Sequence, residues 1–298
     1  MYVVVGANGY LGSYVIKAIL ENTMDDVIAT ARNIVRATKQ DKVTWYKCDI
    51  QNDGDIDTLI DKLSGLDNLK IVYLAAYHQP DIVEKNKSMA WDINVTSLSK
   101  FVNKLNNDCK FYYASTDSVY GESEDEYHYK ENNALNPVNC YGHNKCAAEA
   151  IVIHSGYNVV RFPFLISPSL IYKKHFYDEI VEKVRNGEQM EMFSDSYRSS
   201  LSFDNAARLL IMLMESNKAI PHVVNVCGDR DLSKYDVGQM IAKREHLDPD
   251  LIVPTLMSSG KGTVNKFKTK RATSTLMDNA LLKSILNLDY IDIFELPN

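Results

Sequence analysis

Several features that would place this chain outside the ordinary globular classes are missing. No apolar run approaches the ~20 residues of a membrane-spanning helix, and the first residues lack the basic and long apolar segments of a leader. The five cysteines are scattered and form no Cys-x-x-Cys pair, so neither a disulfide framework nor a zinc site is indicated. The formal net charge is −6, which excludes a general attraction to nucleic acid or to an anionic membrane.

The composition is that of a folded protein. Of the 298 residues 45% are hydrophobic and 24% are charged, which excludes a disordered or fibrous chain and leaves room for one large or two modest domains. The histidines His78, His143 and His154 have no metal-ligand spacing, so we expect no metal. We expect a soluble protein that begins within its own fold, and the cytoplasm is the default compartment.

Short apolar segments typical of β-strands alternate with helical patterns through about residue 165. The expected strands are 2–5, 27–30, 43–48, 71–75, 111–114 and 159–162. The expected crossover helices are 11–19, 56–63, about 82–105 and 142–153. This repeating unit predicts an α/β protein with a Rossmann-type, doubly wound parallel sheet.

The regularity fades after residue 165, which predicts a smaller carboxyl-terminal substrate lobe. The later elements expected are helices at 176–185, 204–214 and 233–246 and strands at 199–203 and 223–226. We therefore assign residues 1–165 to a dinucleotide-binding domain, with returns to the sheet near 199–226, and 166–298 mainly to the substrate lobe. The densest basic stretch, 260–271, is interpreted as a solvated loop.

A glycine-rich turn follows the first expected strand. Gly6, Gly9 and Gly12 stand at the spacing Gly-x-x-Gly-x-x-Gly, and a helical pattern begins at the end of this run. Such glycines permit a tight turn, let the backbone approach a pyrophosphate and let the helix pack closely on the sheet. A simple tight turn between strand and helix is the alternative. The position of this glycine-rich turn, after the first strand of an α/β chain, favours a dinucleotide site over a simple turn.

The ends of the next two strands predict the cofactor. No carboxylate follows the second strand to bind a ribose hydroxyl, and Arg32 offers a guanidinium suited to a 2′-phosphate. The missing carboxylate and Arg32 together favour NADPH as the cofactor, and NADH is the alternative. The other interpretation of Arg32 is an arginine that lies on the surface. Asp49 ends the third strand, where a carboxylate could bind the adenine amino group or could cap the following turn.

A candidate catalytic set comes from two further segments. Tyr141 is the only one of the 18 tyrosines with a lysine four residues later, Lys145, so both side chains share one helical face. A nearby ammonium would favour the phenolate and so lower the pKa of the tyrosine toward the range in which it can act as an acid or base. Thr116 follows the fifth strand, where its hydroxyl could hold a substrate carbonyl.

Together these motifs resemble the extended short-chain dehydrogenases/reductases, the epimerase/dehydratase superfamily, in its branch of dTDP-4-dehydrorhamnose reductases. The resemblance implies Thr116, Tyr141 and Lys145 as catalytic residues. It implies substrate contacts at Thr116, Asp117 and Arg198. The cofactor-binding residues it implies are Gly6, Asn8, Gly9, Tyr10, Leu11, Gly12, Arg32, Asp49, Ile50, Ala75, Ala76, Tyr77, Asn94, Tyr141 and Lys145.

The resemblance also implies an activity. We expect an NADPH-dependent reductase of a nucleotide-linked 4-keto-6-deoxy sugar, acting in the biosynthesis of deoxysugar precursors such as dTDP-rhamnose. A nucleotide-sugar 4-epimerase with a retained cofactor and a non-catalytic, dinucleotide-binding regulatory subunit are the alternatives. A 4,6-dehydratase is disfavoured because Asp117 is followed by Ser118 and not by a glutamate. A homodimer could form through the helices near 90–105 and 142–153.

Overall fold

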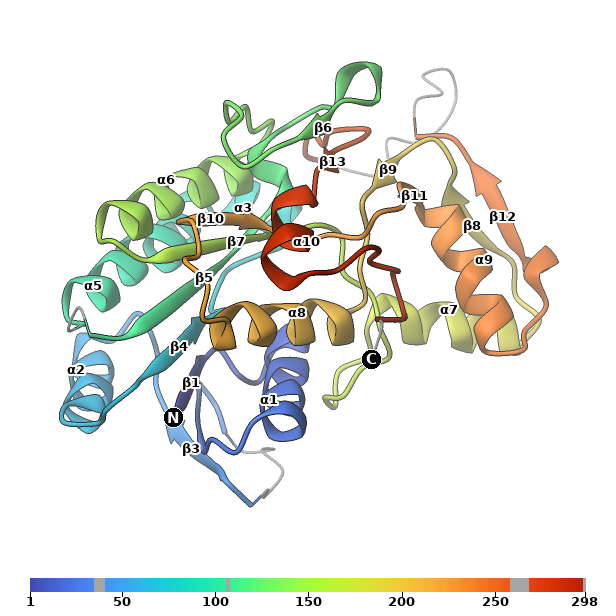
Figure 1. The fold of residues 1–298 in the computed structure, drawn as a ribbon. Helices are drawn as coiled ribbons and strands as arrows, with labels where there is room; N and C mark the ends of the chain where they lie inside the picture. The colour runs from blue at the N-terminus through green and yellow to red at the C-terminus, as the bar shows by residue number, and fades with distance from the viewer. Residues whose placement is uncertain (35–40, 106–107, 258–267, 297–298) are drawn as a thin grey trace.

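The central element is a parallel sheet of seven strands in the order β10-β7-β5-β4-β1-β2-β3 (Figure 1). The computed structural model describes residues 1–34, 41–105, 108–257 and 268–296. The sheet strands are β1 (Tyr2–Val5), β2 (Val27–Ala31), β3 (Val43–Lys47), β4 (Lys70–Tyr73), β5 (Lys110–Thr116), β7 (Asn158–Phe162) and β10 (Val223–Asn225). All neighbouring pairs are parallel, which confirms the Rossmann-type sheet. The strand order reverses between β1 and β4, where such sheets bind ligands.

Helices cover both faces of the sheet, because its central strands are apolar on both sides. Along β1, Val4 packs into one hydrophobic cluster and Val3 into the other. One cluster is covered by α1 (Tyr10–Asn22), α8 (Phe203–Glu215) and α10 (Ala280–Leu286). The other is covered by α2 (Asp53–Leu63), α5 (Ser97–Asn103) and α6 (Cys140–His154).

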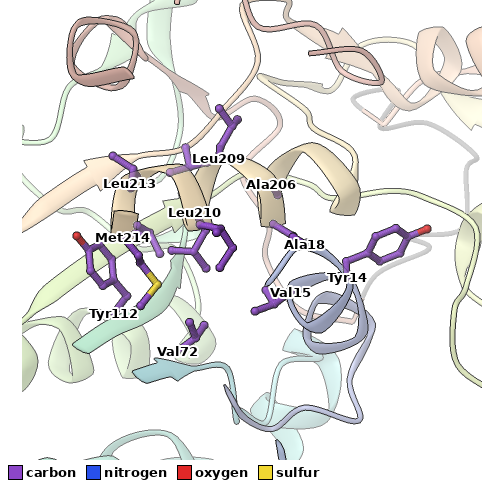
Figure 2. Packing of buried hydrophobic residues seen from close by; sticks show 14 of the residues in the cluster. Tyr14, Val15, Ala18, Val72, Tyr112, Ala206, Leu209, Leu210, Leu213 and Met214 are labelled. Atoms are coloured by element: carbon purple, nitrogen blue, oxygen red, sulfur yellow. The ribbon is translucent and has the colours of Figure 1, made fainter. Parts of the chain in front are cut away.

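Helices α1 and α8 pack directly against each other over the sheet (Figure 2). Ala18 of α1 and Ala206 of α8 lie at the interface, and both are buried. Such small side chains let the two helices approach closely while Leu210 fills the space above Val72 of the sheet. This contact joins the first crossover helix to the later part of the chain.

The predicted helix over 82–105 has one break in the structure, at Asn86, and consists of four helical segments. These are α3 (Pro80–Lys85), α4 (Lys87–Trp91), the π-helical turn η1 (Asp92–Thr96) and α5. Asn86 interrupts the run with φ −128° and ψ 54°, and its side chain donates a hydrogen bond to the Ile82 carbonyl. An asparagine that bonds to nearby backbone in this way competes with continued helix.

The strand predicted at 199–203 was wrong in position and partner. The observed strand β9 (Tyr197–Arg198) pairs with β11 (Leu232–Ser233), outside the central sheet. Ser202 instead caps α8, and its hydroxyl accepts a hydrogen bond from the Asn205 N–H at 3.0 Å. In the 199–226 region it is β10 that pairs in the central sheet, next to β7.

The carboxyl-terminal elements build a further core at one end of the molecule (Figure 1). It includes Ile180, Val237 and Ile252. Its elements are α7 (Phe176–Arg185), β8 (Met190–Phe193), α9 (Lys234–Arg244), η4 (Pro249–Leu251) and β12 (Ile252–Thr255). The domain boundary near 165 stays a prediction. Among the described residues, no helix has both the length and the apolar character needed to cross a bilayer.

Short elements complete the rim of the sheet's carboxyl edge. They are η2 (Asp117–Val119), η3 (Glu124–Glu126), β6 (His128–Tyr129) and β13 (Leu276–Met277). Strand β13 pairs with β6, so the last part of the chain returns to the segment that follows β5. Of the basic stretch 260–271, residues 260–267 lie outside the described residues.

Candidate active site

The glycine-rich turn joins β1 to α1 in a conformation that needs glycine. Gly6 has φ +86°, and a Cβ there would lie 2.8 Å from the Ala75 nitrogen. A Cβ on Gly12 would lie 2.6 Å from the Ala7 carbonyl oxygen. The first-turn N–H groups of a helix have no intrahelical partner, so the start of α1 is suited to an anion. The turn therefore fits a dinucleotide pyrophosphate.

A cavity of about 780 Å³ lies at the carboxyl ends of the central strands. This volume is within the range of small-molecule and cofactor sites. Residues from the glycine turn, from β5, from α6 and from the carboxyl-terminal elements line it together. The predicted site residues among them are Gly6, Asn8, Gly9, Tyr10, Leu11, Gly12, Ala76, Thr116, Asp117, Tyr141, Lys145 and Arg198.

Other predicted cofactor residues lie outside this lining, so their roles stay predictions. Arg32 is exposed directly after β2. Asp49 caps a turn, since its carboxylate accepts a hydrogen bond from the Gln51 N–H at 3.1 Å. Ile50 follows it, and Ala75 and Tyr77 flank the lining residue Ala76.

Asn94 is buried beneath the segment that follows β4. Its side-chain oxygen accepts a hydrogen bond from the Tyr77 N–H at 2.7 Å, and its amide nitrogen donates to the Tyr77 carbonyl at 3.0 Å. The π-helical turn η1 carries this asparagine, and such turns are frequent at functional sites. In this structure Asn94 therefore holds the backbone next to Ala76.

Tyr141 lies in the first turn of α6, close to the end of β5. Asn139 caps the helix and accepts a hydrogen bond from the Gly142 N–H at 3.0 Å. A Cβ on Gly142 would lie 2.6 Å from the Ser118 carbonyl oxygen, so this glycine lets α6 approach η2. The pKa of the Tyr141 phenol is raised and not lowered as expected from the neighbouring lysine: burial raises it, Asp117 raises it further, and a hydrogen bond with Thr116 acts in the opposite direction.

Lys145 follows one helical turn later and is buried, with 2% of its surface exposed. Its ammonium donates a hydrogen bond to the Ala114 carbonyl at 2.5 Å and lies 4.1 Å from the centre of the Tyr113 ring. Burial lowers the pKa of Lys145 to about 7, while the charge of Glu149 acts to raise it. The lysine can therefore change its protonation state near neutral pH.

Thr116, Asp117 and Arg198 form a connected set. The Thr116 hydroxyl donates to the Asp117 carboxylate at 2.9 Å, and Arg198 Nε lies 3.3 Å from the other carboxylate oxygen. Burial raises the pKa of Asp117, and Arg198 opposes that rise. Arg198 also donates hydrogen bonds to the carbonyls of Ala272 and Thr273. It therefore links the chain before β13 to Asp117 in η2, directly after β5.

Basic residues that the sequence did not predict for the site also line the cavity. They are Lys173, Lys174, His175, Lys234 and Arg271. Burial lowers the pKa of Lys234 to about 8 and that of His175 to about 4. The run of basic residues at 173–175, just before α7, is the one sequence pattern that could have indicated these residues. Lys234 and Arg271 are distant in sequence, and only the fold brings them to the cavity.

The sheet, the glycine turn and the Tyr-x-x-x-Lys helix at one cavity define the class of an extended short-chain dehydrogenase/reductase. The chain belongs to the RmlD substrate binding domain family, whose model matches residues 1–288. It is 24% identical over 266 residues to methionine adenosyltransferase 2 subunit beta of Danio rerio, covering 87% of this chain and 78% of that protein.

Solved structures share the fold over nearly the whole chain. A hypothetical dTDP-4-dehydrorhamnose reductase from Sulfolobus tokodaii is 22% identical with a TM-score of 0.78, covering 99% of this chain and 97% of that one. The dTDP-4-dehydrorhamnose reductase of Bacillus anthracis str. Ames, solved with NADP, is 18% identical with a TM-score of 0.77, covering 99% and 94%. The family and the fold predicted from the sequence are therefore confirmed.

Proposed function

We propose that this protein is an NADPH-dependent reductase of a nucleotide-linked 4-keto-6-deoxy sugar. The observation that carries the proposal is the convergence of Thr116, Tyr141 and Lys145 on the cavity that the glycine turn also lines. The turn fits a dinucleotide because Cβ atoms on Gly6 and Gly12 would meet backbone at 2.8 and 2.6 Å. When bound, the nicotinamide supplies hydride to a carbonyl carbon.

The side chains supply the proton and orient the oxygen. The raised pKa of Tyr141 keeps its phenol protonated at neutral pH, as required of the acid that protonates the carbonyl oxygen. Thr116 donates to Asp117 in this structure, and the same hydroxyl can turn to donate to a substrate oxygen. Lys145 is one helical turn from Tyr141, where its charge stabilises a phenolate and its N–H groups can hold a ribose.

The cationic lining supports a substrate with a diphosphate group. Lys173, Lys234 and Arg271 line the same cavity as the catalytic residues. Asp117 and Arg198 are the other candidate substrate contacts, since both line the cavity and pair with each other. Within this substrate class, the proposed substrate is a thymidine-linked 4-keto-6-deoxyhexose.

The test is a panel of nucleotide sugars monitored for loss of NADPH absorbance. We expect one NADPH consumed per molecule of a thymidine-linked 4-keto-6-deoxyhexose and no conversion of ordinary UDP-hexoses. If a UDP-hexose is converted to its epimer at constant NADPH absorbance, the protein is an epimerase and the proposal is wrong.

A regulatory subunit is the second candidate, because a curated relative is named as the beta subunit of a methionine adenosyltransferase. Against it stands the retention of Thr116, Tyr141 and Lys145 at one cavity, which a binding module does not need. NADPH binding without turnover of any keto sugar in the panel would replace the reductase by this candidate.

A further inference from the structure

The buried side of α6 is unusually polar for a helix packed on a sheet. Its members are Gly142, Asn144, Lys145, Ala148, Glu149 and Val152. Val152 is the only large aliphatic side chain among these fully buried residues, and partly buried Ile153 packs against the same hydrophobic cluster. Buried polar contacts therefore add to these apolar contacts in holding the helix that carries Tyr141 and Lys145.

Among the buried polar side chains of α6, Glu149 makes hydrogen bonds with two other elements, β5 and β7. It is 1% exposed and accepts hydrogen bonds from the Ser115 hydroxyl and from Arg161, whose Nε and Nη2 lie 3.0 and 2.6 Å from its two oxygens. Arg161 is 3% exposed and also donates to the Tyr120 hydroxyl at 2.6 Å. A buried ion pair gives little net stability because desolvation offsets its attraction, so stability alone does not account for it.

The pair lies directly behind the catalytic residues. Glu149 follows Lys145 by four residues, so both project from one face of α6. Ser115 immediately precedes Thr116 on β5 and lies opposite Arg161 of β7 in the sheet register. The pair thus connects the strand that carries Thr116 to the helix that carries Lys145.

We propose that Glu149, held by Arg161 and Ser115, is a positioning residue for Lys145. It fixes α6 against β5 and places a carboxylate one helical turn from the lysine ammonium. The inference rests on the proposed role of Lys145 in dinucleotide binding. It adds a residue that does not line the cavity and acts only through another residue.

Several charged or titratable groups surround Lys145, and Glu149 is the one that favours its charged form. Tyr113 on β5 and His78 after β4 also interact with it. Tyr141 lies one turn earlier on α6, Asp117 in η2 acts on Tyr141, and Arg161 on β7 pairs with Glu149. Tyr113 and Tyr141 have raised pKa values and are uncharged at neutral pH. Removing the Glu149 charge should therefore make Lys145 lose its proton at lower pH.

The experiment measures the dissociation constant of NADPH against pH, which requires no sugar substrate. In the unmodified protein we expect affinity to fall as pH rises through the titration of Lys145, and Lys145→Met should abolish this fall. The double variant Glu149→Gln with Arg161→Gln removes both charges and keeps amide hydrogen bonds. We expect the midpoint of this pH dependence to move to lower pH in the double variant, because Glu149 is the charge that favours the protonated form of Lys145.

Val152→Ala is the matched control, because it weakens packing of the same helix without changing charge. It should lower thermal stability and leave the pH midpoint in place. If the double variant does not fold, Glu149→Asp, which retracts the carboxylate by one methylene, should give a smaller shift in the same direction.

A folded double variant with an unchanged midpoint would overturn the role of Glu149, as would an unshifted Glu149→Asp where only that variant folds. Failure of the keto-sugar assay with the shift intact would overturn the proposed function alone. Absence of NADPH binding at every pH would overturn both, because it removes the cofactor on which they depend.

Discussion

Burial acts on the two ionisable residues proposed for catalysis, Tyr141 and Lys145, in opposite directions. It raises the pKa of the Tyr141 phenol and lowers that of the Lys145 ammonium to about 7, because it disfavours the charged form of each. The phenol is therefore kept as a proton donor, while the lysine is poised near neutral pH. This pairing suits the reduction of a carbonyl, in which the oxygen must receive a proton.

Replacement of Tyr141 by phenylalanine removes the proton donor and little else. We expect turnover of the keto sugar to fall by ~10² to 10⁴-fold, the usual contribution of a general acid. NADPH affinity and thermal stability should stay close to those of the unmodified protein, and both can be measured beside the rate. Turnover near the original value would exclude Tyr141 as the acid.

Lys145→Met should change how stability depends on pH. The native pKa of about 7 lies below that of a lysine in an unfolded chain, so the unfolded protein binds more protons between these values. The free energy of unfolding of the unmodified protein should therefore rise with pH, relative to the variant, by about 1.4 kcal/mol per unit between pH ~7 and ~10. Urea unfolding of both proteins across this range measures it, and a constant difference would contradict it.

Arg32 is the residue expected to select the cofactor. It is exposed directly after β2, where a guanidinium could pair with a 2′-phosphate. We expect NADPH to bind more tightly than NADH and Arg32→Ala to reduce the difference by ~1.5–3 kcal/mol, the worth of a charged hydrogen bond. Equal dissociation constants for the two cofactors in the unmodified protein would remove Arg32 from this role.

At the scale of elements, the turn between β1 and α1 is packed more closely at Gly12 than at Gly9. A Cβ on Gly12 would lie 2.6 Å from the Ala7 carbonyl oxygen, whereas one on Gly9 would have its nearest neighbour at 3.4 Å. Gly9 also has an ordinary φ of −81°. The two positions therefore form a matched pair within one turn.

We expect Gly12→Ala to lower the free energy of unfolding by about 1–3 kcal/mol, because the added methyl must displace backbone. Gly9→Ala should cost less, because its contact is at ordinary van der Waals distance and the loss is limited to the weaker N-cap preference of alanine. Chemical denaturation of the two variants compares them directly. Equal losses at both positions would show that the packing of α1 on the turn is not the constraint.

The elements that sequence reasoning found are those with a local cause. The runs of β-branched residues in β1 and β2 predicted the sheet, and the spacing of Tyr141 and Lys145 predicted that α6 presents both to one cavity. The break at Asn86 escaped prediction, because the apolar spacing continues through it while the side chain bonds to backbone.

Parts of the site that depend on distant segments could not be predicted as contacts. Asp117 and Arg198 were each expected to touch substrate, but their ion pair exists only because β9 folds beside η2. The Glu149–Arg161 pair likewise joins α6 to β7 and has no local signature. Such contacts follow from topology, whereas the glycine turn follows from backbone freedom at Gly6 itself.

At the scale of the whole molecule, the strand order brings separate pieces of chain to one cavity. The reversal between β1 and β4 opens the carboxyl edge of the sheet, and β5 and α6 place Thr116, Tyr141 and Lys145 there. The carboxyl-terminal elements then add Lys234 and Arg271 to the same lining. One cavity thus brings together the glycine turn, the three residues proposed for proton transfer and basic side chains that the proposed function assigns to a phosphorylated substrate.

The central claim is that hydride passes from the dinucleotide to the keto carbon of a nucleotide-linked sugar in this cavity. Incubation with NADPH carrying deuterium at carbon 4 of the nicotinamide and with a thymidine-linked 4-keto-6-deoxyhexose tests it most directly. We expect one deuterium on carbon 4 of the sugar product when the label occupies one of the two hydrogen positions at carbon 4 of the nicotinamide, and none when it occupies the other. This product should be lost in the Tyr141→Phe variant. Full recovery of the keto sugar and of the labelled NADPH, under conditions where NADPH is bound, would contradict it.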